Sequence, residues 1–246
     1  MHSVSQRLGT TFFVDGQAGS GKTFLYQTIC AKLRSDRKIV LCVASSGIAA
    51  LLLPGGRTAH SMFKIPIGDL LPDSILPIRK QSDHAEMIQQ AVAIIWDEAA
   101  MQHKHHFEIV SRSFQDLRSD ARPFGGLTIV LGGDFQQIPP VVEKGSKAQI
   151  IGASLISSPI WRNLTHLCLR VNMCIGQGEQ EWAAWLTATG HGHNLDESDR
   201  VQLPDHMQCG TDVSHLISAI YPNIEHHRVG LARKTSPVAN AFTATV

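Results

Sequence analysis

The sequence predicts an α/β fold in which a mostly parallel sheet is flanked by helices. Short β-branched apolar runs alternate with amphipathic segments, which is the pattern of βαβ units. A glycine-rich loop joins the first run to the first amphipathic segment. The chain has 246 residues, of which 43% are hydrophobic and 17% charged. This composition favours a folded core and excludes a disordered chain.

Five apolar runs bounded by Gly, Ser, Asp or Asn are the predicted strands of one open sheet. They cover residues 11–15, 39–44, 91–97, 127–132 and 167–171. Helices are expected at residues 22–34, 48–53, 107–117, 180–188 and 213–221. In the first of these helices Leu25, Ile29 and Leu33 are spaced by four, which predicts one buried face. Residues 66–77 and 190–205 are expected to be irregular.

Charge and cysteine content indicate which partners and which cellular compartment to expect. Lys and Arg number 22 against 21 Asp and Glu, so the net charge of +1 does not demand a polyanionic partner. The five cysteines are scattered without a C-x-x-C pair, which argues against a disulfide framework or a zinc finger and favours a reducing compartment. We expect neither a secretory signal nor a membrane span. A cytosolic or nuclear protein is expected.

The strongest motif fits G-x-x-x-x-G-K-[ST], lies between a predicted strand and a predicted helix, and indicates a phosphate-binding loop. Its glycines let backbone N–H groups surround phosphates, and the helix N-terminus adds a positive dipole end. Lys22 is expected at the β- and γ-phosphates and Thr23 at Mg²⁺. The alternative is an accidental glycine-rich turn. The predicted loop consists of Gly16, Gln17, Ala18, Gly19, Ser20, Gly21, Lys22 and Thr23.

Two adjacent acids end the apolar run at residues 91–97. Asp97 is placed to organise the magnesium ion and Glu98 to act as the general base on the attacking water. Alternatively, the two acids are only a pair at a helix N-terminus. A third polar segment, residues 132–141, follows another predicted strand, so Asp134 or Gln137 is a candidate sensor of the γ-phosphate. The competing interpretation is that Asp134 caps a turn and Gln137 is solvated.

Taken together, these segments resemble superfamily 1 DNA helicases, and most closely the petite-integration-frequency (Pif) branch that includes the helicase of Helitron transposons. Further similarity covers roughly the first 175 residues. The segments that carry it are residues 16–23, 44–50, 55–61, 97–101, 124–126, 132–141, 158–161 and 169–173.

The resemblance implies an ATP-dependent DNA helicase with a P-loop NTPase (RecA-like) domain that binds ATP and Mg²⁺. It assigns catalysis to Lys22, Asp97, Glu98 and Gln137, with Thr23 and Asp97 at the metal. The resemblance also implies that Ser46, His60 and Phe63 lie near single-stranded DNA. Single-strand binding uses aromatic or planar stacking platforms, and His60 and Phe63 are candidates for that role. Phe63 is equally suited to be a core residue.

The resemblance also implies a domain division, partners and roles. Residues 1–165 are expected to form the ATP-binding motor domain 1A, and residues 166–246 an incomplete C-terminal extension, the truncated start of the second motor region. Expected partners are single-stranded DNA and duplex junctions, with no membrane, and the chain is expected to be a monomer. The implied location is the nucleus, with the mitochondrion or cytoplasm as alternatives. Implied roles are DNA repair, recombination and telomere maintenance.

Several departures from the family pattern bear on activity. Cys174 stands where the family has an arginine that reaches the γ-phosphate, and a thiol lacks its fixed positive charge. The motifs of the second motor domain do not occur before Val246, and Gln6 is too close to the loop to match the glutamine that reads adenine. Ala100 in place of Ser is minor. A degenerate, transposon-derived nucleotide-binding remnant without helicase activity is therefore the alternative function. A small-molecule kinase is less compatible with residues 132–141.

Histidines and tryptophans outside these motifs have simpler explanations. The histidines after the acid motif and near residue 191 lack the spacing of metal ligands, so we expect surface residues. The tryptophans are expected to be packing anchors. The histidines concerned are His103, His105, His106, His191 and His193, and the tryptophans are Trp161, Trp182 and Trp185.

Overall fold

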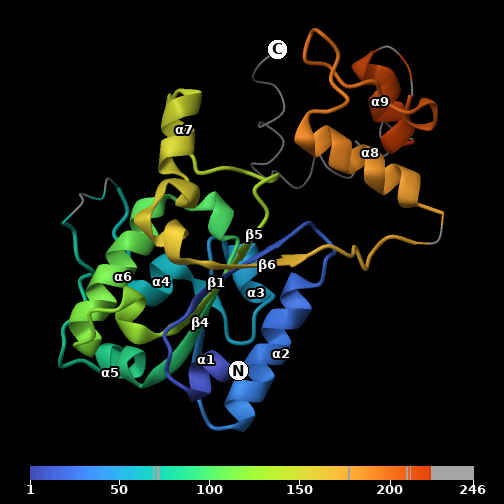
Figure 1. The fold of residues 1–246 in the computed structure, drawn as a ribbon. Helices are drawn as coiled ribbons and strands as arrows, with labels where there is room; N and C mark the ends of the chain where they lie inside the picture. The colour runs from blue at the N-terminus through green and yellow to red at the C-terminus, as the bar shows by residue number, and fades with distance from the viewer. Residues whose placement is uncertain (69, 71–72, 177, 209, 211, 223–246) are drawn as a thin grey trace, which may run out of the picture. The chain divides into compact units, whose positions relative to one another are not determined.

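A computed structural model of the chain describes residues 1–68, 70, 73–176, 178–208, 210 and 212–222 (Figure 1). The chain divides into two compact units, Met1–His191 and Gly192–Val246. The first unit holds the sheet and every segment that carries the predicted chemistry. In the described part of the second unit, a 3₁₀ turn at Asp205–Met207 precedes helix α9, Val213–Ile220. Helix α9 confirms the helix predicted at residues 213–221.

The first unit is built on a six-stranded sheet in which every strand pair is parallel. The strand order is β3-β2-β4-β5-β1-β6. Because all strands run the same way, their carboxyl ends meet at one edge, where loops collect functional residues. The strands are β1 (Thr11–Gly16), β2 (Ile39–Ala44), β3 (Arg57–Thr58), β4 (Ala91–Asp97), β5 (Thr128–Gly133) and β6 (Thr165–Leu169).

The five predicted strands are confirmed, with small shifts at their ends. Strand β6 begins and ends two residues before the predicted run, and β5 is shifted by one residue. Strand β3 was not predicted, since its two residues, Arg57 and Thr58, form no apolar run. Beyond residue 165 the chain still belongs to the sheet, because β6 pairs with β1. The division into motor domains at residue 165 stays a prediction.

Helices cover both faces of the sheet (Figure 1). The predicted helices are confirmed, although α6 begins three residues earlier and α8 continues to His191, into the stretch expected to be loop. Helices α1, α4, α5 and α7 were not predicted. The first-unit helices are α1 (His2–Ser5), α2 (Lys22–Ser35), α3 (Gly47–Leu51), α4 (Ala59–Phe63), α5 (Asp83–Gln90), α6 (Lys104–Arg118), α7 (Lys147–Ala153) and α8 (Gln180–His191).

The buried face of α2 differs by one position from the predicted face. Tyr26, Cys30 and Leu33 are buried, whereas Leu25 and Ile29 are only partly covered. The spacing of Leu25, Ile29 and Leu33 located the helix correctly but placed the centre of its face too early. Tyr26 was not included in the predicted face because a tyrosine has both an apolar ring and a polar hydroxyl, and the sequence alone does not show that it is buried.

Strand residues alternate between two apolar clusters, as the two-residue period of a strand requires. Phe13 and Ile94 belong to the larger cluster, which includes residues of α4, α5 and α6. Their neighbours Val14 and Ile95 belong to the second cluster, with residues of α2 and α3. The sheet is therefore buried on both faces and forms a rigid base for the loops at its edge.

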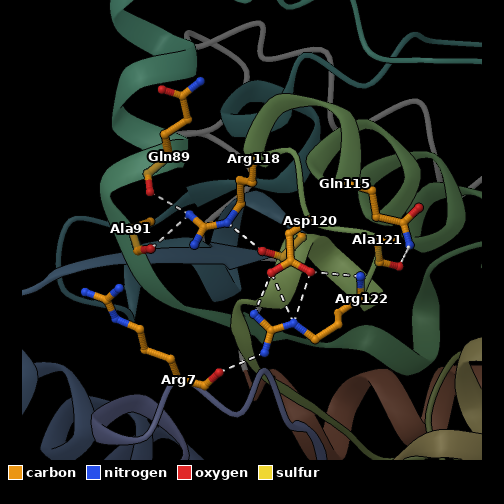
Figure 2. Close-up of polar contacts among 9 residues, drawn as sticks. Arg7, Gln89, Ala91, Gln115, Arg118, Asp120, Ala121 and Arg122 are labelled. Atoms are coloured by element: carbon orange, nitrogen blue, oxygen red, sulfur yellow. Dashed lines mark hydrogen bonds and ion pairs between the residues drawn. The ribbon is translucent and has the colours of Figure 1, made fainter.

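One arginine ties several loops together at the opposite edge of the sheet. The guanidinium group of Arg118, on α6, donates hydrogen bonds to the carbonyl oxygens of Ile88, Gln89, Ala91 and Gly125 over 2.6–3.2 Å. Figure 2 shows the bonds to Gln89 and Ala91. Two of these carbonyls belong to the last turn of α5, where no intrahelical donor remains. Arg118 therefore caps α5 and holds it against the start of β4.

The stretch at residues 66–77 forms no helix or strand where it is described, as expected. It is not wholly superficial, because Leu76 is 4% exposed and its N–H donates to the buried hydroxyl of Ser113. Among the described residues, every helix is too short or too polar to span a lipid bilayer.

Candidate active site

The phosphate loop connects the end of β1 to the start of α2, as the motif predicts. Gly19 has a φ of 80° and Gly21 a φ of 89°, a backbone region that residues with a Cβ adopt rarely. Gly21 is also the N-cap residue of α2, and no side chain among the described residues caps that helix end. The backbone N–H groups at the helix N-terminus therefore remain available to an anion.

Lys22 lies across the loop. Its ammonium group donates to the carbonyl oxygens of Gly16 and Gln17, the second over 3.2 Å. Ser20 is 8% exposed, and its hydroxyl has no hydrogen-bond partner among the described residues. A buried polar group without a partner is costly, and a bound ligand that accepts a hydrogen bond from Ser20 would remove that cost. The loop thus brings together the cation of Lys22 and a hydroxyl that is available to a ligand.

Asp97 ends β4 at the same edge of the sheet. It is 4% exposed, and its carboxylate accepts a hydrogen bond of 2.9 Å from the backbone N–H of Glu98. Burial raises the pKa of Asp97, while that hydrogen bond and the nearby charge of Lys22 oppose the rise. Oxygen ligands suit magnesium, and a carboxylate in this position fits the metal-organising role.

Glu98 follows in a strained backbone conformation, with a φ of 54°. Residues other than glycine adopt this conformation at a cost, and such outliers cluster at functional sites. One of its carboxylate oxygens, Oε2, is buried without a partner among the described residues. Burial and then the charge of Asp97 raise the pKa of Glu98. A carboxyl with a raised pKa suits a general base better than one of ordinary acidity.

The segment after β5 adds a third polar group. Asp134 is 6% exposed and accepts hydrogen bonds from the backbone N–H of Gln136 and the side-chain amide of Gln137, over 2.9 and 3.3 Å. Asp134 therefore caps this turn, as the structural alternative proposed. Gln137 is exposed and hydrogen-bonded to Asp134, so its role as a γ-phosphate sensor stays a prediction.

A segment whose geometry the sequence did not reveal closes the loop from the other side. The side-chain amide of Asn172 donates to the carbonyl of Ala18 over 3.1 Å, and Met173 N–H donates to the carbonyl of Gly19 over 2.8 Å. The amide oxygen of Asn172 accepts from the N–H of Cys174 over 2.9 Å. The first two bonds hold the residues after β6 directly against the phosphate loop, and the third orders the segment itself. The resemblance at residues 169–173 was the only signal for them.

Cys174 consequently lies at the loop. A Cβ atom added at Gly19 would lie 3.1 Å from the Cβ of Cys174 and 2.4 Å from Oδ1 of Asn172. Gly19 is therefore required by close approach as well as by its φ angle. Cys174, the position at which the resemblance leads one to expect an arginine, therefore lies against the phosphate loop.

Two cavities flank this junction. One, of about 800 Å³, is lined by Ala18, Gly19, Gln137 and Cys174 together with side chains of α8. The other, of about 1010 Å³, is lined by Asp15, Gly16, Ser20 and Arg170 among others. Arg170 belongs to the segment at residues 169–173 that resembles the family, and the sequence alone assigns it no role. In the structure it lines the second cavity, beside the loop.

The predicted DNA-contacting residues do not form one surface. Ser46 is half-buried and caps α3, since its hydroxyl accepts from the N–H of Ala49. The ring of Phe63 is 0% exposed and packs against Trp96 and Phe114. The expectation that Phe63 offers a stacking surface to DNA is therefore corrected: its ring belongs to the core. The predicted contacts of Ser46 and His60 with DNA stay predictions.

The histidines after the acid motif are only half-exposed. The ring of His106 contacts the ring of His60, with centroids 4.8 Å apart, and His103 contacts His105 at 4.4 Å. Burial and the neighbouring histidines lower the pKa of His106 to about 4. This cluster joins α4 to the start of α6.

The tryptophans show two kinds of packing. Trp161 packs edge-on against Phe13 and Phe135, which confirms a packing anchor. Trp182 and Trp185 stack on each other along α8, with ring centroids 4.9 Å apart. Both are half-buried, and Trp182 lines the cavity beside Cys174.

A parallel sheet with a glycine loop opening its first long helix, and with acids ending a strand one place further along the same sheet, defines a P-loop nucleoside-triphosphatase domain. Residues 1–200 match the model of the PIF1-like helicase family. The chain belongs to that family.

Individual relatives agree with this assignment. The chain is 34% identical over 186 residues to the ATP-dependent DNA helicase RRM3 of Saccharomyces cerevisiae, which covers 74% of the chain and 25% of the relative. The Pif1 helicase of Candida albicans is similar in structure, with a TM-score of 0.65, 27% identity, and coverage of 84% and 48% of the two chains. The structure of Bacteroides Pif1 bound to single-stranded DNA is similar with a TM-score of 0.64 and 26% identity, and the match covers 77% of this chain and 45% of that one. The chain thus spans less than half of these relatives.

Proposed function

We propose that this chain is the ATP-binding first motor domain of a DNA helicase that couples ATP hydrolysis to movement along single-stranded DNA and to duplex unwinding. The observation that carries the proposal is the convergence of the phosphate loop, Asp97, Glu98 and the residues after β6 at one edge of the sheet. Family membership and the relatives' names support the class of reaction and the DNA partner.

The residues present fit a magnesium triphosphate. Two positive-φ glycines, an uncapped helix start and the cation of Lys22 suit the phosphates, and the unpartnered hydroxyl of Ser20 offers a further donor. Thr23 and Asp97 would hold Mg²⁺, which supplies neutralisation of charge on the phosphate oxygens. Glu98, buried and with a raised pKa, would accept the proton of the attacking water.

Transmission of hydrolysis to DNA is assigned to the loops that follow β2 and β5. Gln137 is hydrogen-bonded to Asp134 directly after β5, and Ser46 caps α3 directly after β2. Both strands neighbour β4, which ends in Asp97. A shift at the acids therefore has a short path to either loop through adjacent strand ends.

Cys174 favours a second candidate function, a nucleotide-binding domain with little or no catalysis. The thiol lies against Gly19, where a guanidinium group would stabilise charge on the transferred phosphoryl group. Loss of such an arginine costs on the order of a thousandfold in rate. Weak Mg-ATP binding, slow hydrolysis and no unwinding are expected of this chain alone.

ATPase assays with and without single-stranded DNA separate the two candidates. The wild-type chain, Lys22→Ala and Cys174→Arg are compared at equal folded concentration. Under the helicase proposal, DNA stimulates hydrolysis and Lys22→Ala abolishes it. Under the second candidate function, hydrolysis is slow with and without DNA, and Cys174→Arg increases it. Strong DNA stimulation that is indifferent to Cys174→Arg would remove the argument for a degenerate remnant. Robust unwinding by the 246-residue chain would contradict the expected inactivity of the single domain.

We extend the proposal to features supported only by the resemblance. They are action as a monomer at duplex junctions, location in the nucleus, and roles in repair, recombination and telomere maintenance. Descent from the Helitron branch belongs to the same group. Sedimentation of the purified chain with and without a forked DNA tests the monomer, and imaging of a tagged chain tests the location.

A further inference from the structure

A buried tyrosine beside the acids is not explained by the proposed roles. Tyr26 lies on α2, one turn after Lys22, and its side chain is 0% exposed. Its hydroxyl has no hydrogen-bond partner among the described residues. Burying a hydroxyl without a partner carries a cost in free energy. A phenylalanine would avoid that cost, so the hydroxyl needs a reason.

The position of the hydroxyl gives that reason. A Cβ atom added at Gly132, on β5, would lie 1.5 Å from Oη of Tyr26 and 3.5 Å from Oδ1 of Asp97. The phenol therefore fills the space over Gly132 and ends beside the carboxylate of Asp97. Glycine at 132 is what makes this space available.

The chemistry of the two groups is complementary. A phenol donates one hydrogen bond, and an ionised carboxylate accepts several. A tyrosine phenol keeps its proton at neutral pH and is therefore available as a donor. Asp97 already accepts from the N–H of Glu98 and has further lone pairs to offer.

We propose that Tyr26 is a positioning residue that donates its hydroxyl to Asp97 and orients this carboxylate for the magnesium ion of the bound nucleotide. The inference rests on the proposed function, since it concerns the same site. Groups that orient a metal ligand typically change metal affinity by 10–100-fold when removed. Tyr26 acts through Asp97 and touches neither the phosphates nor the attacking water.

Binding of a fluorescent ATP analogue tests the proposal, because it needs no turnover. Wild type, Tyr26→Phe and Tyr221→Phe are titrated with the analogue in EDTA and then with increasing Mg²⁺. Tyr221, the second of two tyrosines in the chain, is 59% exposed and serves as the matched control. Metal-free binding also verifies that each variant is folded. The Mg²⁺ concentration at half-maximal enhancement of binding is the readout.

Tyr26→Phe is expected to need roughly tenfold more Mg²⁺ while its metal-free binding matches wild type. Tyr221→Phe is expected to match wild type in both conditions. A Tyr26→Phe variant with the wild-type Mg²⁺ requirement would overturn the proposal, as would equal losses with and without the metal, which indicate a merely structural role. If wild type itself binds no nucleotide in either condition, the proposed function fails and this inference fails with it.

Discussion

Substituting Gly132 with alanine probes the packing beneath the acids most severely. The new Cβ would lie 1.5 Å from Oη and 2.6 Å from Cζ of Tyr26, both far inside van der Waals contact. The ring is fully enclosed, and Gly132 is in the middle of a sheet that is buried on both faces.

The expected cost follows from this geometry. Overpacking by one methyl group costs about 1–3 kcal/mol in buried sites, and two ring atoms in collision place this site at the upper end. We therefore expect Gly132→Ala to lower the free energy of unfolding by about 3 kcal/mol. For a protein of this size the melting temperature should fall by about 6–12 °C.

Urea unfolding and thermal melts of wild type and two variants test this value. Gly152→Ala is the matched control, because Gly152 is in α7 and no atom lies within 4 Å of its added Cβ. Alanine is the better helix former, so the control should gain about 0.5–1 kcal/mol. A Gly132→Ala variant as stable as wild type would refute the placement of Tyr26 over Gly132.

Three further perturbations have defined outcomes. Arg118→Met should lower the free energy of unfolding by about 2–3 kcal/mol in urea titrations, because four backbone carbonyls lose their donor. The control variant Arg162→Met, at an exposed arginine, should change the free energy of unfolding little. Burial lowers the pKa of His106 to about 4, below the value of about 6.5 in the unfolded chain. As the pH drops from about 6.5 to 4, the unfolded chain therefore binds the proton before the folded chain does, and the free energy of unfolding should fall. After allowance for partial exposure the loss is about 1–2 kcal/mol, and His106→Gln should lack that acid sensitivity in urea titrations at both pH values. Asn172→Ala should weaken binding of a fluorescent ATP analogue roughly tenfold, since it removes the tie to Ala18, with unchanged affinity as the contrary result.

Much of the sheet was predictable because its strands are buried on both faces. Such strands read as continuous apolar runs, and residues 91–97 are the clearest example. Strand β3 was not predictable, since Arg57 and Thr58 are defined by pairing with β2 rather than by their own composition. The buried face of α2 was displaced because the space over Gly132, which Tyr26 fills, exists only in the folded sheet.

The candidate site was predictable wherever one short segment supplies both geometry and chemistry. The phosphate loop and the acids at Asp97 and Glu98 are of this kind. The contact of Asn172 with Ala18 joins residues 154 positions apart, and spacing alone gives no sign of it. The burial of Phe63 could not be predicted either, because an aromatic residue beside a polar motif is equally compatible with the core and with the surface.

Titration of the folded chain with Mg-ATP, monitored by heat release, is the most direct measurement of the central claim. Wild type should bind one nucleotide per chain, and Lys22→Ala should lose at least about tenfold in affinity, because the cation across the loop is removed. Wild type that releases no heat, or a Lys22→Ala variant with wild-type affinity, would contradict the account.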